Sequence, residues 1–329
     1  MVHFQKAVFV TVAAVIPHWN RRDLLAALME NLRRQRRAFD RVIVADNGST
    51  DASAEMAERA GACALRLGAN LGFAAAVNRA IEAAECDWVA ILNNDVTLDP
   101  GWLETLLEVA AREHAWFAAG KILSASHPNV VDGCFDEIAR SGCAWRCGAG
   151  RPDSPAWNQF QRIRIAPMTA ALFRRDLFRH VGPLDERFES YLEDVDFGIR
   201  CSLQGFAGVY APSALAWHLG SATAGKWSSD TVRRISRNQF LLAAKHFGGQ
   251  PLWPIVWGQL LWGLVALRHG KLLSYLRGKW EGYRRRPPIG PAPSQIHAFL
   301  KESERTIFEL QRRTGFDLYW RIYFWLSAA

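Results

Sequence analysis

The sequence predicts an α/β fold in which a mostly parallel central sheet, flanked by helices, is followed by a C-terminal helical region. Over the first 125 residues, short apolar runs alternate with amphipathic segments, which is the pattern of repeated strand–helix units. From about residue 230 onward, apolar residues recur at helical spacing. With 50% hydrophobic and 22% charged residues, the 329-residue chain can form full apolar cores in about two folding units.

The predicted elements follow one another through short loops. In the first part we expect strands at 7–16, 41–46, 63–67 and 88–92 and helices at 22–36 and 73–84. A further helix should follow the second strand, with Ser49, Thr50 or Asp51 available as its N-cap. Residues 126–225 are rich in Gly, Pro and Ser and predict loops with mixed strands. Helices are expected at 230–247, 251–268 and 271–285, and two more follow a stiff proline-rich linker at 287–293.

The cysteines and the N-terminal segment predict a cytoplasmic protein. Six cysteines in 329 residues are too few for a secreted disulfide framework. Residues 7–16 are as apolar as the centre of a signal peptide, but no small-residue cleavage site follows, so a buried first strand is the better interpretation. We therefore expect reduced thiols.

Basic and aromatic residues are concentrated in the last third of the chain. The formal net charge is +8, but residues 1–225 hold 23 Lys and Arg against 26 Asp and Glu, whereas residues 226–329 hold 17 against 6. The second segment also contains seven of the 14 Trp residues. Trp beside Lys and Arg is typical of a membrane interface and also of a nucleic-acid groove.

Polar residues follow three of the predicted strands. They are Pro17, His18, Trp19 and Asn20 after the first strand, Asp46 to Ser49 after the second, and Asn93, Asn94 and Asp95 after the fourth. Each set alone would be explained by a turn, but parallel strands bring their carboxyl ends to one edge, where ligands bind. Asp46 could accept hydrogen bonds from a nucleoside; without a GxGxxG loop, a Rossmann dehydrogenase is not expected. Asp95 is a candidate ligand for Mg²⁺.

The acidic segment 184–206 is a second candidate. Glu189, Glu193, Asp194 and Asp196 are close in sequence, and a helix beginning near Asp194 would direct that residue to the rim of the sheet. Neighbouring like charges raise the pKa of at least one carboxyl group, which suits a general base. The alternative is an acidic helix N-terminus that the helix dipole alone favours.

His218 and three cysteines are the remaining candidates. A histidine beside an aromatic residue is most often part of the core, but the small-residue loop after His218 could lie against phosphates, which favours a metal or diphosphate contact. Cys134, Cys143 and Cys147 with His127 match no common zinc-ligand spacing, so a zinc site is not expected.

Six segments resemble, in order and spacing, the family 2 nucleotide-sugar glycosyltransferases with a GT-A (Rossmann-like) fold, especially their rhamnosyltransferase-like branch. They read VIPHWNRRDLL, RVIVADNGSTD, ANLGFAAAVNRAI, WVAILNNDVTLDPGWL, PLDERFESYLEDVDFGIRCSLQGF and AWHLGSATAG, and the match covers about residues 8–245. The resemblance implies a catalytic domain at 1–225, with a nucleotide-sugar half at about 1–125 and an acceptor half at about 126–225. The basic, Trp-rich helical region 226–329 follows it.

The resemblance also implies a role for each matching residue. The nucleotide contacts are Pro17, Trp19, Asn20 and Asp46, with Asn70 and Gly72 in the floor of the pocket. Asn93, Asn94 and Asp95 occupy the place of the family's DxD motif, so Asp95 and His218 are expected at the metal and diphosphate. Glu193 and Asp194 match the ED motif, whose second acid is the expected base. The segment PMTAALFRRDLF resembles the strand that lines the acceptor side.

This site predicts an inverting transfer. An acceptor hydroxyl attacks the anomeric carbon opposite the nucleoside diphosphate while Asp194 takes its proton, and Asp95 with a divalent cation, Mg²⁺ or Mn²⁺, neutralises the leaving group. The two Asn residues of the triplet leave little charge for the metal, so we expect the cation to bind together with the donor. The expected donor is dTDP-L-rhamnose or a similar sugar nucleotide.

The C-terminal region predicts a membrane partner. Residues 251–267 carry no charge but are shorter than the roughly 20 residues of a membrane span, and a series of Lys and Arg residues follows them. A helical hairpin in the membrane surface is favoured; a helix packed on the catalytic domain and a single span are the alternatives. We therefore expect a peripheral enzyme of the inner leaflet that acts on a saccharide or polyprenyl-linked acceptor in cell-surface polysaccharide synthesis, and no nucleic-acid binding.

Two other functions are considered. A sugar nucleotidyltransferase would ordinarily carry a Gly-rich basic loop after the first strand, where this chain has PHWNRRDL. A catalytically silent membrane adaptor with the same fold is left open by the Asn-Asn-Asp triplet.

Overall fold

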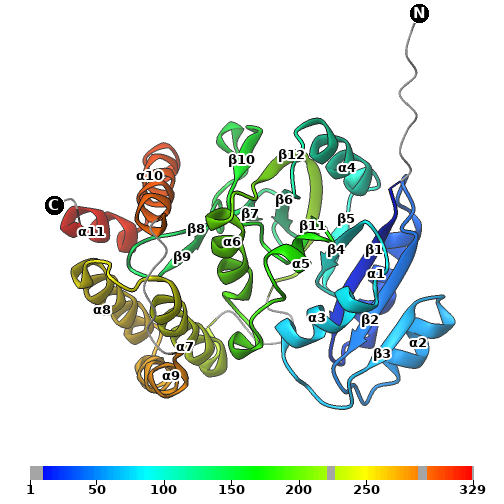
Figure 1. The fold of residues 1–329 in the computed structure, drawn as a ribbon, viewed down its shortest axis with the longest axis horizontal. Coiled ribbons are helices and arrows are strands. Elements are labelled where there is room, and N and C mark those ends of the chain that lie inside the picture. Colours follow the sequence, from blue (N-terminus) through cyan, green and yellow to red (C-terminus); the bar gives the residue numbers. More distant parts are fainter. Residues whose placement is uncertain (1–9, 221–226, 288–294, 328–329) are drawn as a thin grey trace, which may run out of the picture.

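The computed structural model describes residues 10–220, 227–287 and 295–327 (Figure 1). A ten-stranded mixed sheet forms its centre, with the strand order β10-β12-β6-β11-β4-β1-β2-β3, and with β5 and β7 paired to β12 and β6. Strands β4, β1, β2 and β3 are parallel to one another, whereas β11 is antiparallel to both of its neighbours. The predicted α/β class is confirmed.

The first part of the chain contains the predicted strand–helix repeats. In order, they are β1 (Val12–His18), α1 (Arg22–Arg33), β2 (Arg41–Asp46), α2 (Ser53–Arg59), β3 (Cys63–Arg66), α3 (Phe73–Ala83) and β4 (Trp88–Leu92). Strand β1 extends two residues beyond its predicted end, because its pairing with β2 continues through Pro17 and His18. Its pairing with β4 ends earlier, at Val15. The start predicted at residue 7 lies outside the described residues.

The middle of the chain adds short strands and the acidic helix. Its elements are β5 (Val96–Leu98), α4 (Trp102–Arg112), β6 (Phe117–Ser124), β7 (Val131–Gly133), β8 (Asp136–Ile138), β9 (Ala144–Arg146), η1 (Pro155–Trp157), β10 (Gln161–Ile163), β11 (Ala170–Arg174), α5 (Leu177–His180), η2 (Glu186–Phe188), α6 (Glu193–Leu203) and β12 (Gly208–His218). Several of these strands have only three residues, which explains why periodicity gave no boundaries here.

Five helices follow, at the end of the molecule that Figure 1 shows on the left. They are α7 (Ser229–His246), α8 (Leu252–Arg268), α9 (Leu272–Arg285), α10 (Ile296–Thr314) and α11 (Leu318–Ser327). Helices α7 and α9 approach closely because α9 presents glycines: a Cβ on Gly278 would lie 2.2 Å from the Arg233 carbonyl oxygen, and one on Gly282 would lie 2.7 Å from that of Arg237.

The C-terminal helices share apolar clusters with the sheet half. Ile307 of α10 and Tyr323 of α11 are fully buried in the cluster that contains the sheet residues Val15 and Ile91. Polar contacts add to this packing, since Ser303 Oγ accepts a hydrogen bond from the Ile138 amide at 2.8 Å. The division into domains at residue 225 stays a prediction. Within the described ranges, no helix has the length and hydropathy needed to cross a bilayer.

Candidate active site

The carboxyl ends of β1, β2 and β4 meet at one edge of the sheet. His18 pairs with Asp46 across β1 and β2, and the Asn47 amide donates to the His18 carbonyl at 2.7 Å. After β4, the Asn94 side-chain amide donates to His18 Nδ1 at 2.9 Å. The sheet register therefore brings together the three polar segments that the sequence places after separate strands.

Hydrogen bonds within this edge shape the predicted nucleotide pocket. The Asn20 amide donates to Ser49 Oγ at 2.8 Å, and Asp46 accepts from the Ser49 amide at 3.2 Å. Asn70 Oδ1 accepts from the Gly72 amide at 3.1 Å. Trp19 is 43% exposed beside this network, so its ring surface is open for stacking against a flat ligand.

Gly72 is required where it stands. Its φ is +90°, and a Cβ there would lie 2.9 Å from the Glu189 carbonyl oxygen. The loop before α3 is thus pressed against the segment that precedes α6, because only glycine permits this conformation and approach.

Asp95 and His218 form the second part of the site. Strand β12 pairs with β5, with His218 opposite Val96, and His218 Nε2 lies 3.2 Å from Asp95 Oδ1. The other ring nitrogen, Nδ1, lies 2.9 Å from Asp132 Oδ2. Burial alone would lower the pKa of His218, but its hydrogen bonds to Asp132 and Asp95 raise that pKa to about 9.

Glu193 and Asp194 begin helix α6 and are both buried. Burial raises the pKa of both carboxyl groups; the charge of Asp194 adds to the effect on Glu193, and the charge of Asp136 adds to the effect on Asp194. Arg146 opposes this shift in Asp194, with its Nη2 at 3.4 Å from Asp194 Oδ2. A buried carboxylate with a raised pKa is suited to accept a proton near neutral pH.

A chain of hydrogen bonds joins Asp194, the predicted base, to the Asn-Asn-Asp segment. The Asn93 amide donates to the Thr169 carbonyl at 2.9 Å, and Thr169 Oγ1 accepts from Arg146 at 3.0 Å. Arg146 in turn contacts both Asp136 and Asp194. The predicted base and the predicted metal end are therefore held on the same rim by β9, β11 and β4.

Two acids of the 184–206 segment do not belong to this site. Glu189 accepts hydrogen bonds from Arg234 and Arg285 at 2.8 and 2.9 Å, and Asp196 is fully buried against α7. Despite burial, ion pairing lowers the pKa of both carboxyl groups. The expected effect of a neighbouring like charge is present at one carboxyl group, because the charge of Asp194 raises the pKa of Glu193, although burial is the larger cause there. It does not extend to Glu189 and Asp196, which are paired with bases.

Arg146 and Asp132 are site residues that the sequence did not single out. Both lie in the irregular middle, on strands of three residues, where no spacing distinguishes them from surface charges. His18 lies in the polar segment after the first predicted strand, but the sequence predicted no role for it. Burial lowers the pKa of His18 to about 4, and its Nε2 atom has no hydrogen-bond partner within the described part of the chain.

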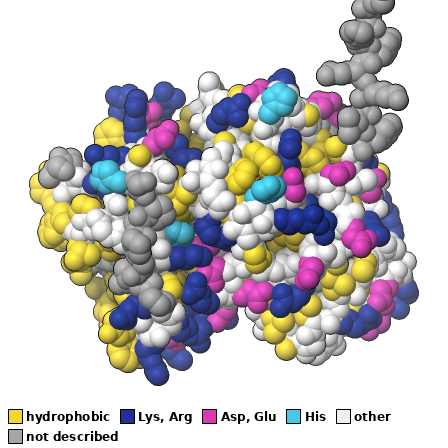
Figure 2. Space-filling view, in the orientation of Figure 1, with side chains coloured by type: hydrophobic (Ala, Val, Ile, Leu, Met, Phe, Trp, Pro, Cys, Tyr) yellow, Lys and Arg dark blue, Asp and Glu magenta, His cyan; other side chains and the backbone are white. Residues whose placement is uncertain are grey.

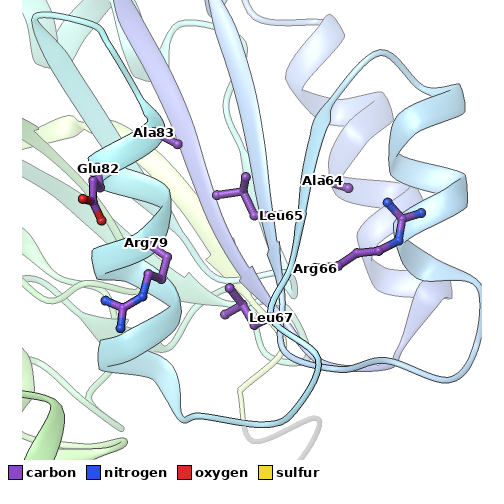
Figure 3. Close-up of a pocket in the computed structure, with 7 residues that line it drawn as sticks. All are labelled: Ala64, Leu65, Arg66, Leu67, Arg79, Glu82 and Ala83. Carbon is purple, nitrogen blue, oxygen red and sulfur yellow. The ribbon is translucent and has the colours of Figure 1, made fainter.

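A shallow hollow of about 450 Å³ lies between β3 and α3 (Figure 3). The residues that line it are Ala64, Leu65, Arg66, Leu67, Arg79, Glu82 and Ala83. None of the predicted site residues is among them. Its open shape at the edge of the sheet gives no enclosed binding site.

The fold is that of GT-A glycosyltransferases. A structure of GalNAc-T7 with UDP, GalNAc and Mn²⁺ superposes with a TM-score of 0.65 at 11% identity, over 94% of this chain and 59% of that one. A mannosyltransferase from Pyrobaculum calidifontis, solved with GDP-Man and Mn²⁺, gives a TM-score of 0.53 at 16% identity, over 98% and 87% of the two chains. At these identities the likeness concerns the fold alone.

The sequence comparisons identify the family. The model of glycosyl transferase family 2 matches residues 13–182. The N-acetylglucosaminyl-diphospho-decaprenol L-rhamnosyltransferase of Mycobacterium tuberculosis is 31% identical, over 72% of this chain and 84% of that protein. The O-antigen biosynthesis protein RfbC of Myxococcus xanthus is 27% identical, over 64% and 17%. The chain belongs to glycosyl transferase family 2, in its rhamnosyltransferase-like branch, and is a glycosyltransferase.

Proposed function

We propose that this glycosyltransferase moves L-rhamnose, or a closely related sugar, from dTDP-L-rhamnose to a saccharide or lipid-linked saccharide acceptor, with inversion at the anomeric carbon. The likeness to the mycobacterial L-rhamnosyltransferase over 84% of that protein carries the choice of donor and acceptor. The single rim that holds Asp194 and Asp95 supports the transfer chemistry. The family also favours a transferase over a nucleotidyltransferase or a silent adaptor.

The residues along the rim have different proposed roles. The nucleotide side comprises Pro17, Trp19, Asn20, Asp46, Asn70 and Gly72, with Asn93 and Asn94 towards the diphosphate. The acceptor hydroxyl attacks the anomeric carbon, the bond from that carbon to the diphosphate oxygen breaks, and the hydroxyl proton passes to Asp194. Glu193, buried beside Asp194 with its own pKa raised, keeps the base in a poorly solvated setting.

A divalent cation fits the other end of the rim. A carboxylate and an imidazole are suitable ligands for Mn²⁺ or Mg²⁺, and Asp95 and His218 offer them 3.2 Å apart. Among the residues that the structure describes, no group of three or more His, Cys, Asp or Glu side chains is arranged to hold a metal. Oxygens of the donor diphosphate are therefore needed to complete the coordination, and the bound cation would offset the charge that develops on the leaving group.

Asp95→Ala should remove the metal dependence of donor binding. In a thermal-shift titration of the wild type, dTDP-L-rhamnose with Mn²⁺ should raise the melting temperature more than the donor with chelator, because a ligand that binds only the native state stabilises it. The variant should show the same small shift under both conditions. A wild-type shift that is unaffected by chelator would contradict the metal role, and a shift with other nucleotide sugars only would contradict the donor.

Helix α8 supports the proposal that the enzyme lies on the inner face of the cell membrane. One of its faces, with Gly258 and Leu261, is buried against the rest of the protein. The opposite face exposes residues at helical spacing: Leu252, Val256, Leu260, Leu264 and Leu267, which are 49–73% exposed. Helix α8 therefore packs on the rest of the protein through one face and leaves the opposite apolar face exposed, and we propose that the exposed face lies in the membrane surface.

Basic side chains surround this apolar face. Arg268 follows it directly, and α9 contributes exposed arginines and the exposed aromatic side chains Trp280 and Tyr283. Figure 2 shows hydrophobic and basic side chains intermixed at this end of the molecule, where α8, α9 and α11 lie in Figure 1. Apolar residues at acyl-chain depth with cations at anionic headgroups match a bilayer surface, which is also where a lipid-linked acceptor resides.

The paired change Leu260→Glu and Leu264→Glu should abolish most binding to vesicles of phosphatidylcholine with phosphatidylglycerol. Losing the burial of one leucine weakens binding by roughly tenfold or more, and both residues are exposed, so the melting temperature should stay unchanged. Co-flotation measures the effect, with Phe160→Glu as the control, because Phe160 is also an exposed apolar residue but lies just before β10 and not on α8 or α9. Equal flotation of the paired variant and the wild type would contradict the proposal.

A further inference from the structure

Asp132 reaches the same histidine as Asp95 but from the opposite side of the ring. Its Oδ2 atom lies 2.9 Å from His218 Nδ1, whereas Asp95 Oδ1 lies 3.2 Å from His218 Nε2. Both His218 and Asp132 are largely withdrawn from solvent, with side chains 11% and 28% exposed. The Asp132 contact is therefore a sheltered hydrogen bond rather than a surface ion pair.

The sheet fixes this arrangement through three neighbouring strands. β6 lies between β12 and β7, with Ser124 opposite His218 on one side and Leu123 opposite Val131 on the other. The ends of β6 and β12 are also joined, since the Ala125 amide donates to the His218 carbonyl at 2.9 Å. Asp132 is the extra residue between Val131 and Gly133, which pair with the consecutive β6 residues Leu123 and Ile122. It therefore stands beside His218 at a β-bulge that strand pairing fixes on both sides.

We infer that Asp132 is a positioning residue that holds a proton on His218 Nδ1. Nε2, after releasing to solvent the proton that it shares with Asp95, then presents its lone pair to the divalent cation bound with Asp95. This inference rests on the proposed metal role of Asp95 and His218. A histidine ligand generally donates its other ring N–H to a carboxylate or carbonyl, which fixes the tautomer and the ring orientation. Asp132 occupies the position of that acceptor.

The geometry assigns Asp132 to orientation rather than coordination. A cation on Nε2 lies on the side of the ring away from Nδ1, and Asp132 contacts Nδ1. Gly220 lies near this acid, since a Cβ built there would be 3.7 Å from Asp132 Oδ1. Loss of Asp132 should therefore weaken metal binding without removing a metal ligand.

Titration of the purified full chain with Mn²⁺ in the presence of saturating dTDP, followed by the electron paramagnetic resonance signal of free Mn²⁺, tests the inference. Asp132→Ala should weaken Mn²⁺ binding by about 10- to 100-fold, the usual cost of removing such a partner. Asp132→Asn should lose less, because its amide oxygen still accepts from Nδ1–H. The affinity for dTDP in chelator should change by less than about twofold in both variants, which a general structural defect would not allow.

Three further variants separate the possible failures. His218→Ala and Asp95→Ala should each weaken Mn²⁺ binding at least as much as Asp132→Ala, whereas Asp317→Ala, which removes an acid paired with Arg151, should have no effect. Normal Mn²⁺ affinity in both Asp132 variants, with the His218 and Asp95 variants impaired, overturns the inference alone. Normal affinity in all four overturns the proposed metal site as well. If Asp132→Ala does not fold, Asp132→Leu takes its place, because leucine is close in size to aspartate and also removes the acceptor for Nδ1–H. Normal Mn²⁺ affinity in Asp132→Leu, with His218→Ala impaired, would contradict the role.

Discussion

Asp194→Asn should lower the rate of sugar transfer by about 10²- to 10⁴-fold, the usual contribution of a general base, while the donor still binds. The amide keeps the size of the side chain and can still accept the 2.8 Å hydrogen bond of the Val195 amide through its one oxygen. It loses proton acceptance at the other oxygen, together with the longer contact to Arg146 at 3.4 Å. The measurement is kcat with saturating donor, together with the dissociation constant of the donor.

The pH dependence of the transfer rate gives a second test of Asp194 as the base. Since burial raises the pKa of Asp194, the wild-type rate should begin to fall with acid at a higher pH than an ordinary aspartate would give. The residual rate of the variant should lack this acidic limb. Glu186→Gln is a suitable control, because Glu186 lies in the same segment but pairs with Arg79 at the surface. Unchanged turnover in Asp194→Asn would exclude Asp194 as the base.

Asp196→Ala should destabilise the protein by roughly 3–5 kcal/mol, the cost of breaking a buried ion pair from one side. The Asp196 side chain is fully buried and lies 2.7 Å from His246 Nε2 and 2.8 Å from Lys245 Nζ, with Arg200 at 2.9 Å. Removing it leaves bases of α6 and α7 without their common acid. The free energy of unfolding in urea measures the loss.

The stability that Asp196 contributes should also depend on pH in a defined direction. Burial would raise the pKa of Asp196, but His246, Arg200 and Lys245 lower it. Its contribution to stability is therefore present at neutral pH and is lost as the pH falls below the ordinary range of aspartate. Asp230→Ala is the control, because that acid is 54% exposed in its pairs with Arg233 and Arg234 and should cost less than about 1 kcal/mol. Equal losses in both variants would contradict the account.

The elements of the first half could be predicted because their signals are local. Alternating apolar strands and amphipathic helices define β1 to β4 and α1 to α3, and parallel pairing then forces the polar strand ends onto one rim. The helices after residue 229 were equally predictable, since apolar residues recur over 10–19 positions in each. The rest of the middle required tertiary contacts that no local pattern contains.

Asp194 and Asp196 show where sequence proximity misleads. The two acids are two positions apart on α6, and residues at that spacing do not share a helix face. One therefore faces Arg146 on the site side, and the other faces His246 on α7. Asp132 and Arg146 carried no signal in the sequence, because their roles depend on β7 and β9, which are short strands positioned by distant partners.

The most direct test of the account is a transfer reaction with purified protein, dTDP-L-rhamnose, Mn²⁺ and a short polyprenyl diphosphate N-acetylglucosamine acceptor. The account predicts release of dTDP, which chelator prevents, and a lipid-linked disaccharide whose new bond has the anomeric configuration opposite to that of the donor, as read by nuclear magnetic resonance. A product with retained configuration would contradict the direct displacement assisted by Asp194. Absence of transfer from this donor, with transfer from another nucleotide sugar, would contradict the proposed rhamnosyl specificity.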